Sequence, residues 1–476
     1  MSINYDVVVL GGGTGGYVAA IQAAKNGQKV AVVEKAKLGG TCLHQGCIPT
    51  KALLRSAEVF QTVKKAADFG VEGKGLESST LNFLTVQKRK QAIVDRLEMG
   101  IQGLFKQGGI DLYIGEGTIL GTSIFEPKAG IVSFPIEGQD NEMLVPKQLI
   151  IATGSRPKAL PGLAFDEEVV LSSDGMLSLS QLPKSIIIIG GGVIGMEWAS
   201  MLRDFGVEVT VLEYLDQIIP GEDGEIAKEL LRNLKKRKVS IHTGAKVIAE
   251  SLVRKDGLVS IESTIKGKNQ TFTAEKIMIS VGRMANIDSI GLDNTKIVVE
   301  NGFIKVNESY QTKESHIYAI GDIIATPQLA HVAMREGLLA ANHLSGKSVK
   351  PLVYDDIAKC VYTSPEIASI GISEELAKDR GLDVKTGKFS FRGNGKALVY
   401  GEGDGFVKVV ADKKTNDLLG VSIIGPHATD LISEAALARF LDATAWEIGQ
   451  TIHPHPTLSE ALGEAALMVD GLGIHG

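Results

Sequence analysis

The chain has 476 residues, of which 44% are hydrophobic and 22% charged, and its formal net charge is −6. This length exceeds one ordinary core, so we expect a soluble globular protein of two to four domains. The negative charge argues against nucleic acid as a partner. The longest apolar run, Ser185 to Ile194, contains three glycines and precedes Glu197, so no membrane span is expected.

Three cysteines are too few for a disulfide-scaffold protein, and one close pair fits a reducing compartment. No basic segment precedes an apolar one at the N-terminus, where Asp6 interrupts the first hydrophobic residues. We therefore expect a cytoplasmic protein, or one of an organelle matrix if the chain is a processed product.

The N-terminal segment reads as strand, glycine-rich turn, helix and strand. We expect the strands at Tyr5 to Leu10 and Lys29 to Glu34, with a helix between them that reaches Gly27. This order, with an acidic residue at the end of the second strand, is the pattern of a dinucleotide-binding unit. A glycine-rich turn that serves packing alone is the alternative.

Each residue of this pattern has a physical role. Gly11 makes the turn, Gly13 lets the backbone approach a pyrophosphate, and Gly16 lets helix and strand pack closely. The positive end of the helix dipole faces the phosphates. The carboxylate of Glu34 can accept both ribose hydroxyls.

The segment GGTCLHQGCIPTK, residues 39–51, holds Cys42 and Cys47. In a regular helix their Cα atoms would lie roughly 8.6 Å apart, whereas a disulfide needs about 7 Å or less. A bond between them requires a bent segment, for which Gly46 and the Gly39-Gly40 pair provide the permissive backbone. A strained bridge in a short loop is easily reduced, which suits redox chemistry. Half of a metal site, or two unrelated thiols, are the alternatives.

The next segment returns to the first sheet. Pro49 lies where a helix can restart, and we expect helices at about 51–68 and 82–107. A β-rich stretch with hairpins, polar at Glu137 to Asn141, leads to a buried strand, Leu149 to Gly154, that ends on glycine.

A second copy of the pattern starts at Ser185. A strand is followed by Gly190, Gly192 and Gly195, a helix to Phe205 and a strand that ends at Glu213; the first glycine precedes the acid by 23 residues in both copies. This copy ends on the strand Ile277 to Ile279 and Gly282-Arg283. Two such units imply two dinucleotides, of which one flavin and one nicotinamide is the simplest pair. Glu213 would repel a 2′-phosphate, so NAD is favoured over NADP.

Two further acids have alternative interpretations. Glu197, which we place in the first turn of the second helix, either interacts favourably with the helix dipole or is a buried partner of Lys51. Asp322 ends a strand at His316 to Ile320 and either bonds a flavin ribitol hydroxyl or is a buried loop carboxylate. The helix that follows, from Leu329 to His343, can direct its first amides at a flavin.

From about residue 355 the pattern changes to an antiparallel sheet, with strands near 406–410 and 418–424 and helices near 429–440, 444–451 and 457–469. Two prolines fix the backbone around His455. His455 is a general base if Glu460 orients it, whereas Glu460 closes a helix if Thr457 and Glu460 form a capping box. Both interpretations stay open, and His453 is expected to be structural.

Taken together, these motifs resemble the flavin disulfide oxidoreductases over the full length of the chain. The resemblance rests on six motifs: residues 11–16, 39–51, 152–154, 190–195 with Glu197, 319–322 and 455–460. His44 and Ala285 depart from the family's usual Asn and Pro. The resemblance implies an α/β fold with two Rossmann-like dinucleotide-binding domains, for FAD and NAD, and a C-terminal α+β dimerisation domain. The expected divisions are 1–150, 151–284, 285–354 and 355–476.

The resemblance also implies the residues of the site. Cys42 exchanges with the substrate, Cys47 contacts the flavin, His455 and Glu460 act in the active site of the other subunit, and Lys51 with Glu197 tunes the flavin. Cofactor contacts are expected from Gly11, Gly13, Gly16, Glu34, Thr41, Cys42, Lys51, Gly117, Thr153, Gly154, Asp322, Ala330, Gly190, Gly192, Gly195, Glu213, Val247 and Gly282.

The most similar members of that family act on dihydrolipoyl groups. This similarity implies a homodimer that serves a lipoyl-bearing protein of a multienzyme complex. Relatives that reduce glutathione disulfide would need arginines beside Glu213, and those that reduce mercuric ion or thioredoxin use a further C-terminal cysteine pair, whereas no cysteine follows Cys360. A transhydrogenase, or a flavin-bearing docking subunit without turnover, is the remaining alternative.

Overall fold

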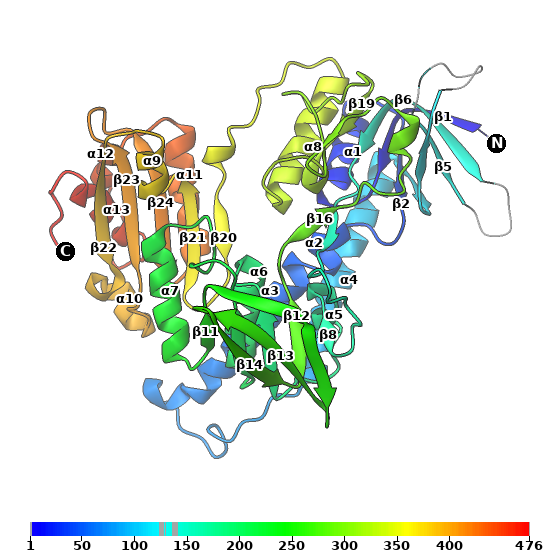
Figure 1. Ribbon diagram of the computed structural model, residues 1–476. Helices are drawn as coiled ribbons and strands as arrows, with labels where there is room; N and C mark the ends of the chain where they lie inside the picture. The colour runs from blue at the N-terminus through cyan, green and yellow to red at the C-terminus, as the bar shows by residue number, and fades with distance from the viewer. Residues whose placement is uncertain (1, 123–127, 129, 136–140, 476) are drawn as a thin grey trace. The chain divides into compact units, whose positions relative to one another are not determined.

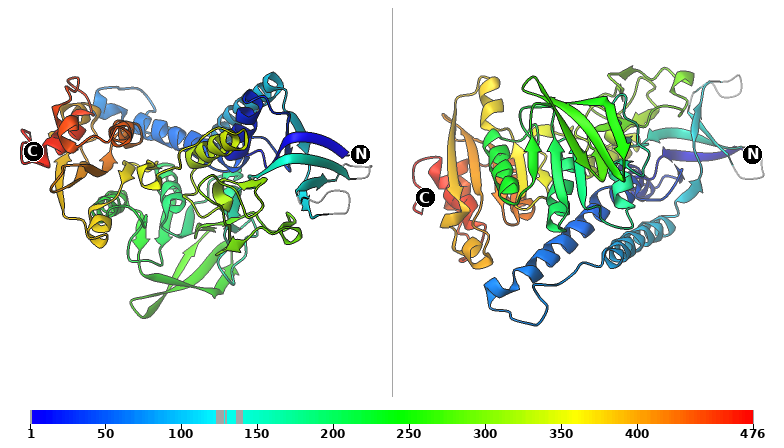
Figure 2. Two further views of the ribbon diagram at one scale, coloured as in Figure 1. Left: turned by 90° about the horizontal axis from the view of Figure 1, so that it is seen from above. Right: turned by 60° about the horizontal axis from the view of Figure 1, so that its bottom comes forward.

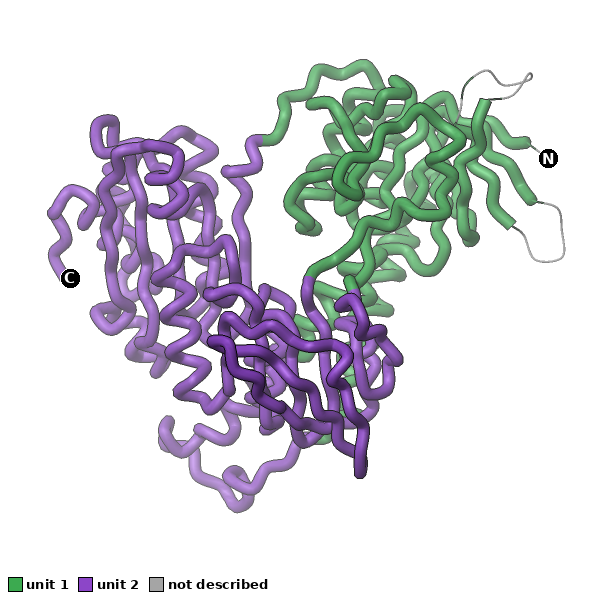
Figure 3. Tube along the Cα trace, in the orientation of Figure 1, with its two compact units in different colours: residues 1–53, 82–158, 282–352 green, residues 54–81, 159–281, 353–476 purple. Residues whose placement is uncertain are grey.

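The computed structural model describes residues 2–122, 128, 130–135 and 141–475. The chain divides into two compact units, which Figure 3 shows in two colours. Unit 1 comprises residues 1–53, 82–158 and 282–352, and unit 2 comprises residues 54–81, 159–281 and 353–476. Each unit is therefore built from three separate segments of the chain, so residues far apart in the sequence lie in the same unit.

Unit 1 is built on a mixed sheet with the order β3-β2-β1-β6-β5-β4, to which β19 adds beside β6 (Figure 1). The central strands β1, β2, β3, β6 and β19 run parallel, and β4 and β5 form an antiparallel extension. The strands are β1 (Ser2–Leu10), β2 (Val30–Glu34), β3 (Asp111–Ile114), β4 (Thr118–Leu120), β5 (Ile131–Phe134), β6 (Glu142–Ile151) and β19 (Ile317–Ala319). Buried Val, Ile and Leu side chains of β1, β2 and β6 form the core.

Small residues let the helices of unit 1 pack closely. Helices α1 (Thr14–Lys25) and α8 (Ala330–Leu344) lie side by side. A Cβ atom at Gly337 would lie 2.5 Å from the backbone oxygen of Gly15, so only glycine fits where the two helices meet. The other long helix, α4 (Phe83–Gly108), begins where the Asn82 side chain accepts a hydrogen bond from the Thr85 amide.

Short elements complete unit 1. They are α2 (Gly40–His44), the start of α3 (Cys47–Lys64), the antiparallel pair β7 (Ser155–Pro157) and β16 (Arg283–Ala285), the pair β17 (Val299–Glu300) and β18 (Phe303–Ile304), and the single turns η2 (Leu292–Asn294) and η3 (Gly321–Ile323).

Unit 2 begins with a parallel sheet of order β11-β10-β9-β15-β8. Its strands are β8 (Val170–Leu171), β9 (Ser185–Ile189), β10 (Glu208–Leu212), β11 (Ser240–His242) and β15 (Lys276–Ile279). The registers repeat those of unit 1: Leu10 pairs with Val33 and Ile151, and Ile189 pairs with Leu212 and Ile279. The internal repeat predicted from the glycine spacing is therefore present as two sheets of the same parallel order around the first strand.

Helices and a small antiparallel sheet accompany the parallel sheet of unit 2. Strands β12, β13 and β14 form a sheet of their own, drawn in green in Figures 1 and 2. The elements are α5 (Ser173–Leu177), α6 (Val193–Asp204), α7 (Gly224–Lys236), β12 (Ala245–Lys255), β13 (Leu258–Ile265) and β14 (Lys268–Ala274), with η1 (Ala66–Phe69) after α3. The basic run 235–238 lies at the end of α7 and is largely exposed, as expected for a solvated helix end.

The C-terminal part of unit 2 is an antiparallel sheet of order β20-β21-β24-β23-β22 covered by helices. Its strands are β20 (Lys359–Val361), β21 (Glu366–Gly371), β22 (Val384–Ser390), β23 (Phe406–Asp412) and β24 (Leu418–Gly425). Its helices are α9 (Glu374–Asp379), α10 (Gly395–Tyr400), α11 (Ala428–Phe440), α12 (Ala445–Gln450) and α13 (Glu460–Met468), with η4 (Tyr354–Asp356) and η5 (Phe391–Gly393). The antiparallel sheet expected here is confirmed.

Some element boundaries differ from the expected ones. The helix expected at 51–68 begins at Cys47 and ends at Lys64, because the bend at Gln45 and Gly46 lets the second cysteine start it. The helix expected from residue 457 begins only at Glu460. The hairpin predicted before β6 is present as β5 and β6, while residues 136–140 of its polar turn lie outside the described residues.

Candidate active site

The first glycine of each fingerprint occupies the same strained position. Gly11 has φ +103° and Gly190 has φ +110°. A Cβ atom would lie 2.4 Å from the backbone oxygen of Ala152 at Gly11, and 2.4 Å from that of Ser280 at Gly190. Both the backbone conformation and the close contact therefore require glycine.

Of the other two glycines in each fingerprint, one is required by close packing and one has open space beside its backbone. A Cβ at Gly16 would lie 1.9 Å from the Gly11 oxygen, and one at Gly195 would lie 2.0 Å from the Gly190 oxygen. At Gly13, by contrast, the nearest atom is 3.9 Å away, and no described atom lies within 4 Å of a Cβ at Gly192. Gly13 and Gly192 thus leave their backbones accessible, as a bound pyrophosphate requires.

The acid of each copy is held by the glycine-rich turn. Glu34 accepts hydrogen bonds from the amides of Gly12 at 2.7 Å and Ala36 at 2.8 Å. Glu213 accepts from Gly191 at 2.5 Å and Leu215 at 2.7 Å. Both carboxylates are buried, yet each keeps oxygen lone pairs for the two hydroxyls of a ribose.

The helices that follow present unblocked amides. Helices α1 and α6 begin after Gly13 and Gly192, and neither N-terminus receives a hydrogen bond from a capping side chain. Anions bind well at such ends because the first amides and the helix dipole both favour negative charge. Open glycine backbone, free amides and a fixed acid fit one dinucleotide diphosphate in each unit, so the residues present fit FAD and NAD.

The cysteine segment is bent where the spacing requires it. Helix α2 ends at His44, Gln45 leaves the helical conformation with φ −134°, and Cys47 begins α3. Gly39 and Gly40 both have positive φ, and the Gly39 amide donates to the Gly12 oxygen at 2.8 Å. The segment therefore packs directly on the first glycine-rich turn.

The two sulfurs of this segment contact each other. No disulfide joins Cys42 and Cys47 in this structure, and their side chains share a hydrogen bond. This bond and burial raise the pKa of Cys42, which the Lys51 ammonium opposes. Tyr17, whose own pKa is raised by burial and by Cys42, lies beside them. A reduced pair with a raised pKa needs an external base to form the thiolate that attacks or is attacked.

Asp322 lies in the turn η3 and is held by two residues that the sequence motifs did not identify. The Ser155 hydroxyl donates to its carboxylate at 2.5 Å. Arg283 in turn donates to the Ser155 hydroxyl at 2.7 Å and to the Ser155 carbonyl at 2.8 Å. A third residue, the fully buried Glu336, accepts from the Gly321 amide at 2.7 Å and fixes the same turn.

A signal for these residues existed in the sequence. Ser155 follows Gly154 and Arg283 follows Gly282, so both come directly after glycines that end strands, where ligands bind in α/β sheets. Asp322 is accordingly held by contacts within unit 1, and its bond to a flavin ribitol hydroxyl stays a prediction. The first amides of α8, beginning at Ala330, are again free of a side-chain cap.

Several predicted cofactor residues make contacts within their own unit. The Thr153 hydroxyl donates to the Asn286 oxygen at 2.6 Å, and the Gly154 oxygen accepts from the Asn286 amide at 2.8 Å. Gly117 is buried, and a Cβ there would lie 2.5 Å from Leu10. The remaining predictions concern Thr41 in α2, Val247 in β12 and Gly282 after β15. Cofactor contacts of all these residues stay predictions.

Glu197 does not lie in the first turn of α6, contrary to expectation. It is the fifth residue of a helix that begins at Val193, and it is 4% exposed. Its Oε1 atom accepts from the Tyr362 amide at 2.9 Å. The interpretation as a first-turn acid favoured by the helix dipole is therefore wrong. Because Lys51 belongs to unit 1 and Glu197 to unit 2, their pairing stays a prediction.

His455 and Glu460 contact each other, whereas the predicted capping box forms only in part, because the Thr457 hydroxyl donates to the Pro454 oxygen and Ser459 is the N-cap of α13. One oxygen of Glu460 lies 2.8 Å from His455 Nδ1, and the other accepts from the Thr457 amide at 2.8 Å. Glu460 thus holds the imidazole and also the Thr457 amide just before α13, while the role of His455 as a general base stays a prediction. The His455 side chain is 79% exposed, so its opposite nitrogen, Nε2, is available to a substrate. The approach of His455 to the cysteines of another subunit stays a prediction.

In the part of the chain that the structure describes, no group of three or more His, Cys, Asp or Glu side chains is arranged to hold a metal ion. No described helix combines the length and the apolar character that crossing a bilayer needs.

Comparison with known proteins gives the same picture. The family model "Pyridine nucleotide-disulphide oxidoreductase" matches residues 5–337, and that family's dimerisation domain matches residues 357–466. Dihydrolipoyl dehydrogenase of Bacillus subtilis (strain 168) is 60% identical over 476 residues and covers 100% of both chains. Mitochondrial dihydrolipoyl dehydrogenase of Pisum sativum is 39% identical, covering 99% of this chain and 92% of that protein. The crystal structure of LpdA from Mycobacterium tuberculosis is similar with a TM-score of 0.89 and 26% identity, covering 97% and 99% of the two chains.

Proposed function

The chain belongs to the pyridine nucleotide-disulphide oxidoreductase family, and we propose that it works as a dihydrolipoyl dehydrogenase. It is a flavoprotein oxidoreductase with FAD and NAD as cofactors, and it oxidises dihydrolipoyl groups to lipoyl groups while NAD⁺ becomes NADH. The observation that carries this proposal is the contact of Cys42 and Cys47 on a bent segment against the first dinucleotide turn, in a chain 60% identical to a protein of that name.

The chain's own residues support each part of the dithiol chemistry. His455, held by Glu460, takes the proton of a substrate thiol, and the resulting thiolate attacks the Cys42 sulfur of the oxidised pair. This attack breaks the Cys42–Cys47 bond and releases Cys47 as a thiolate. The second substrate thiol then loses its proton to the solvent and attacks the first substrate sulfur, which closes the lipoyl disulfide and releases Cys42, protonated by His455. FAD held at Gly13 and Glu34 would supply the acceptor for the electron pair of the reduced cysteines, and NAD⁺ held at Gly192 and Glu213 would supply the final hydride acceptor. Lys51, whose charge opposes the raised pKa of Cys42, favours the thiolate form.

Glu213 supports NAD over NADP at the second site. Its carboxylate is fixed by two backbone amides beside the fingerprint, where a 2′-phosphate would meet negative charge. Glu34 supports the adenosine ribose of FAD at the first site in the same way.

The assembly extends beyond one chain. The dimerisation domain matched at residues 357–466 supports a homodimer. We propose that His455 and Glu460 complete the active site of the other subunit, and that a lipoyl-bearing protein of a 2-oxo acid dehydrogenase or glycine cleavage complex is the partner. We also propose the bacterial cytoplasm as the compartment, which the bacterial relative at 60% identity supports.

A division into functional domains accompanies this proposal. We assign residues 1–150 and 285–354 to FAD, 151–284 to NAD and 355–476 to dimerisation. The separate sheets described above, and the gap between the two family matches at residues 338–356, support these limits.

The test compares acceptors and donors on the purified protein. We expect NADH to be oxidised with lipoamide, little reaction with NADPH, and none with glutathione disulfide or mercuric ion. Cys42→Ser should abolish lipoamide reduction, whereas Cys360→Ser, the matched control at the half-buried third cysteine, should retain it. Unchanged lipoamide reduction in Cys42→Ser would overturn the proposal in favour of a docking subunit. Faster reaction with NADPH and glutathione disulfide would indicate a glutathione reductase.

A further inference from the structure

A second pair of imidazole and carboxylate lies next to His455 and Glu460. His453 Nε2 lies 2.7 Å from Glu434 Oε1, and Glu434 belongs to α11. The His453 side chain is 9% exposed, against 79% for His455, so the two histidines of this segment have opposite environments. One is buried against the protein while the other is presented to the solvent.

The buried ring is fixed on both of its edges. While Nε2 contacts Glu434, the other edge lies on α13, where a Cβ atom at Gly463 would approach His453 Nδ1 to 2.8 Å. Gly463 lies one helical turn after Glu460, on the same face of α13. A residue larger than glycine at 463 would displace the ring, so α13 is shaped to receive His453.

Hydrogen bonds within residues 453–460 connect the fixed His453 to the part of the segment that carries His455. The Thr457 hydroxyl donates to the Pro454 oxygen at 2.7 Å, and the Thr457 amide donates to Glu460. His453 ties one end of the segment 453–460 to α11, and Glu460 ties the other end to α13. His455 lies between these two fixed points.

The charges of the two pairs also influence each other's pKa values. The hydrogen bond to Glu434 raises the pKa of His453 despite burial, and the charge of Glu460 acts in the same direction. Burial opposes ionisation of Glu460, but the Thr457 amide and the hydrogen bond and charge of His455, together with the charge of His453, lower the pKa of Glu460. Both pairs thus favour an ionised Glu460.

We propose that Glu434 and His453 are positioning residues for the reaction: together they hold the segment that presents His455 to the substrate dithiol. This inference rests on the proposed function, because it assigns His455 the role of base. It predicts that the length of residue 434 matters more than its charge, since the distance to His453 sets the position of the segment.

The experiment uses the FAD-loaded enzyme and two assays. Oxidation of dihydrolipoamide with NAD⁺ needs the base, whereas oxidation of NADH with ferricyanide takes electrons from the reduced enzyme without a dithiol. Glu434→Ala should lower kcat for dihydrolipoamide about tenfold, as small displacements of a catalytic group do. The ferricyanide rate should stay within about twofold.

The matched control is Glu464→Ala. Glu464 lies on α13 and contacts His475 Nδ1 at 2.7 Å. The substitution therefore removes a similar pair of carboxylate and imidazole without touching the segment 453–460. This variant should keep both rates. Two conservative variants separate length from charge: Glu434→Gln should retain a higher dihydrolipoamide rate than Glu434→Asp, which shortens the side chain by one carbon.

The outcomes are separable. If the wild-type protein does not oxidise dihydrolipoamide, the proposed function fails. If it does, and Glu434→Ala equals Glu464→Ala, or Glu434→Asp matches or exceeds Glu434→Gln, the positioning role is overturned. An equal loss of both rates in Glu434→Ala, with a lower unfolding temperature, would make the pair a stabilising contact only and would also overturn it. The Gln and Asp comparison decides the question if the Ala variant does not fold.

Discussion

Ser155 donates a 2.5 Å hydrogen bond to the carboxylate of Asp322, across 167 residues of sequence. Arg283 fixes Ser155 from the other side with hydrogen bonds to its hydroxyl and its carbonyl. The predicted flavin ligand Asp322 is therefore held by a chain of contacts before any cofactor binds. Such an arrangement reduces the cost of ordering the site when the ligand arrives.

Ser155→Ala should weaken FAD binding. The hydrogen bond to a carboxylate contributes about 1.5–3 kcal/mol, so its loss should raise the Kd of the apoprotein for FAD about tenfold or more. Quenching of FAD fluorescence during reconstitution measures this. Ser263→Ala is the control, since Ser263 is buried in β13 and its hydroxyl has no hydrogen-bond partner among the described residues. Equal Kd values for the two variants would contradict the role of Ser155.

Substitutions of two glycines should have opposite effects on folding and binding. Gly16→Ala places a Cβ 1.9 Å from a backbone oxygen, so this variant should yield little folded protein. Gly192→Ala meets no described atom within 4 Å and should fold with a normal unfolding temperature, yet bind NADH at least about tenfold more weakly. Circular dichroism and NADH titration check the two outcomes. Normal NADH affinity in Gly192→Ala would argue against a pyrophosphate at this turn.

Glu213→Gln should narrow the preference for NADH over NADPH. The amide removes the charge that repels a 2′-phosphate and places a donor opposite the Leu215 amide. We expect kcat/KM for NADH to fall about tenfold while that for NADPH falls less or rises. Glu208→Gln, at the exposed start of the same strand, should change neither value. A preserved NADH preference in Glu213→Gln would place the selectivity elsewhere.

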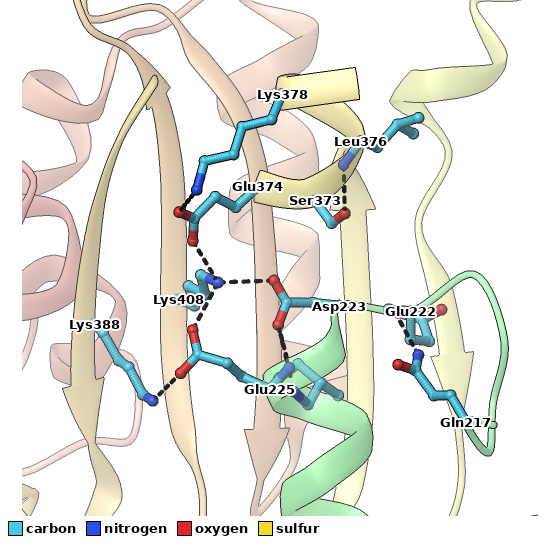
Figure 4. A network of polar contacts seen from close by, with 11 residues as sticks. Gln217, Glu222, Asp223, Glu225, Ser373, Glu374, Leu376, Lys378, Lys388 and Lys408 are labelled. Carbon is cyan, nitrogen blue, oxygen red and sulfur yellow. Dashed lines mark hydrogen bonds and ion pairs between the residues drawn. The ribbon is translucent and has the colours of Figure 1, made fainter. Parts of the chain in front are cut away.

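Lys408→Met should destabilise the protein strongly. Figure 4 shows Lys408, whose side chain is 3% exposed, between carboxylates of α7 and α9. It contacts Asp223 at 2.9 Å, Glu225 at 2.8 Å and Glu374 at 2.9 Å. Removing it leaves the buried carboxylate of Asp223 without its ion pair, at a cost of about 3–5 kcal/mol. Denaturant unfolding should show this loss, whereas Lys413→Met, at an exposed pair, should stay within about 0.5 kcal/mol.

The same cluster should make stability depend on acid pH. Hydrogen bonds from Lys388 and Lys408 lower the pKa of Glu225 from 4.5 to about 2. The folded form binds this proton less readily than the unfolded form, so the stabilisation is complete above pH 4.5 and is lost as the pH falls toward about 2. The unfolding temperature of the wild-type protein should therefore fall more steeply over this range than that of Glu225→Gln. Parallel curves would show that Glu225 contributes nothing to the acid sensitivity.

Local patterns predicted the two dinucleotide turns well, because Gly11, Gly16 and their counterparts are constrained by their own backbone. The pair of His455 and Glu460 was predictable for the same reason, being five residues apart. Ser155, Arg283 and Glu434 were not predicted as site residues, since each acts on a partner that only the folded chain brings close.

Strands of the C-terminal sheet show a similar limit. β23 was predicted from its apolar run, yet Lys408 inside that run gave no indication of being buried. Its burial depends on carboxylates contributed by α7 and α9, which the sequence around Lys408 does not contain. Strand β22, with alternating exposed and buried residues and a central Gly387, lacked an apolar run and was not predicted.

The backbone at Gly40 passes so close to the backbone at Gly13 that a Cβ atom at Gly40 would lie 2.7 Å from the Gly13 Cα. The loop of the sulfur pair and the turn of the first fingerprint therefore touch at this point, and we expect an inserted residue in either loop to disturb the contact. In a library of random insertions, active clones with an added residue in one loop should carry a compensating insertion in the other.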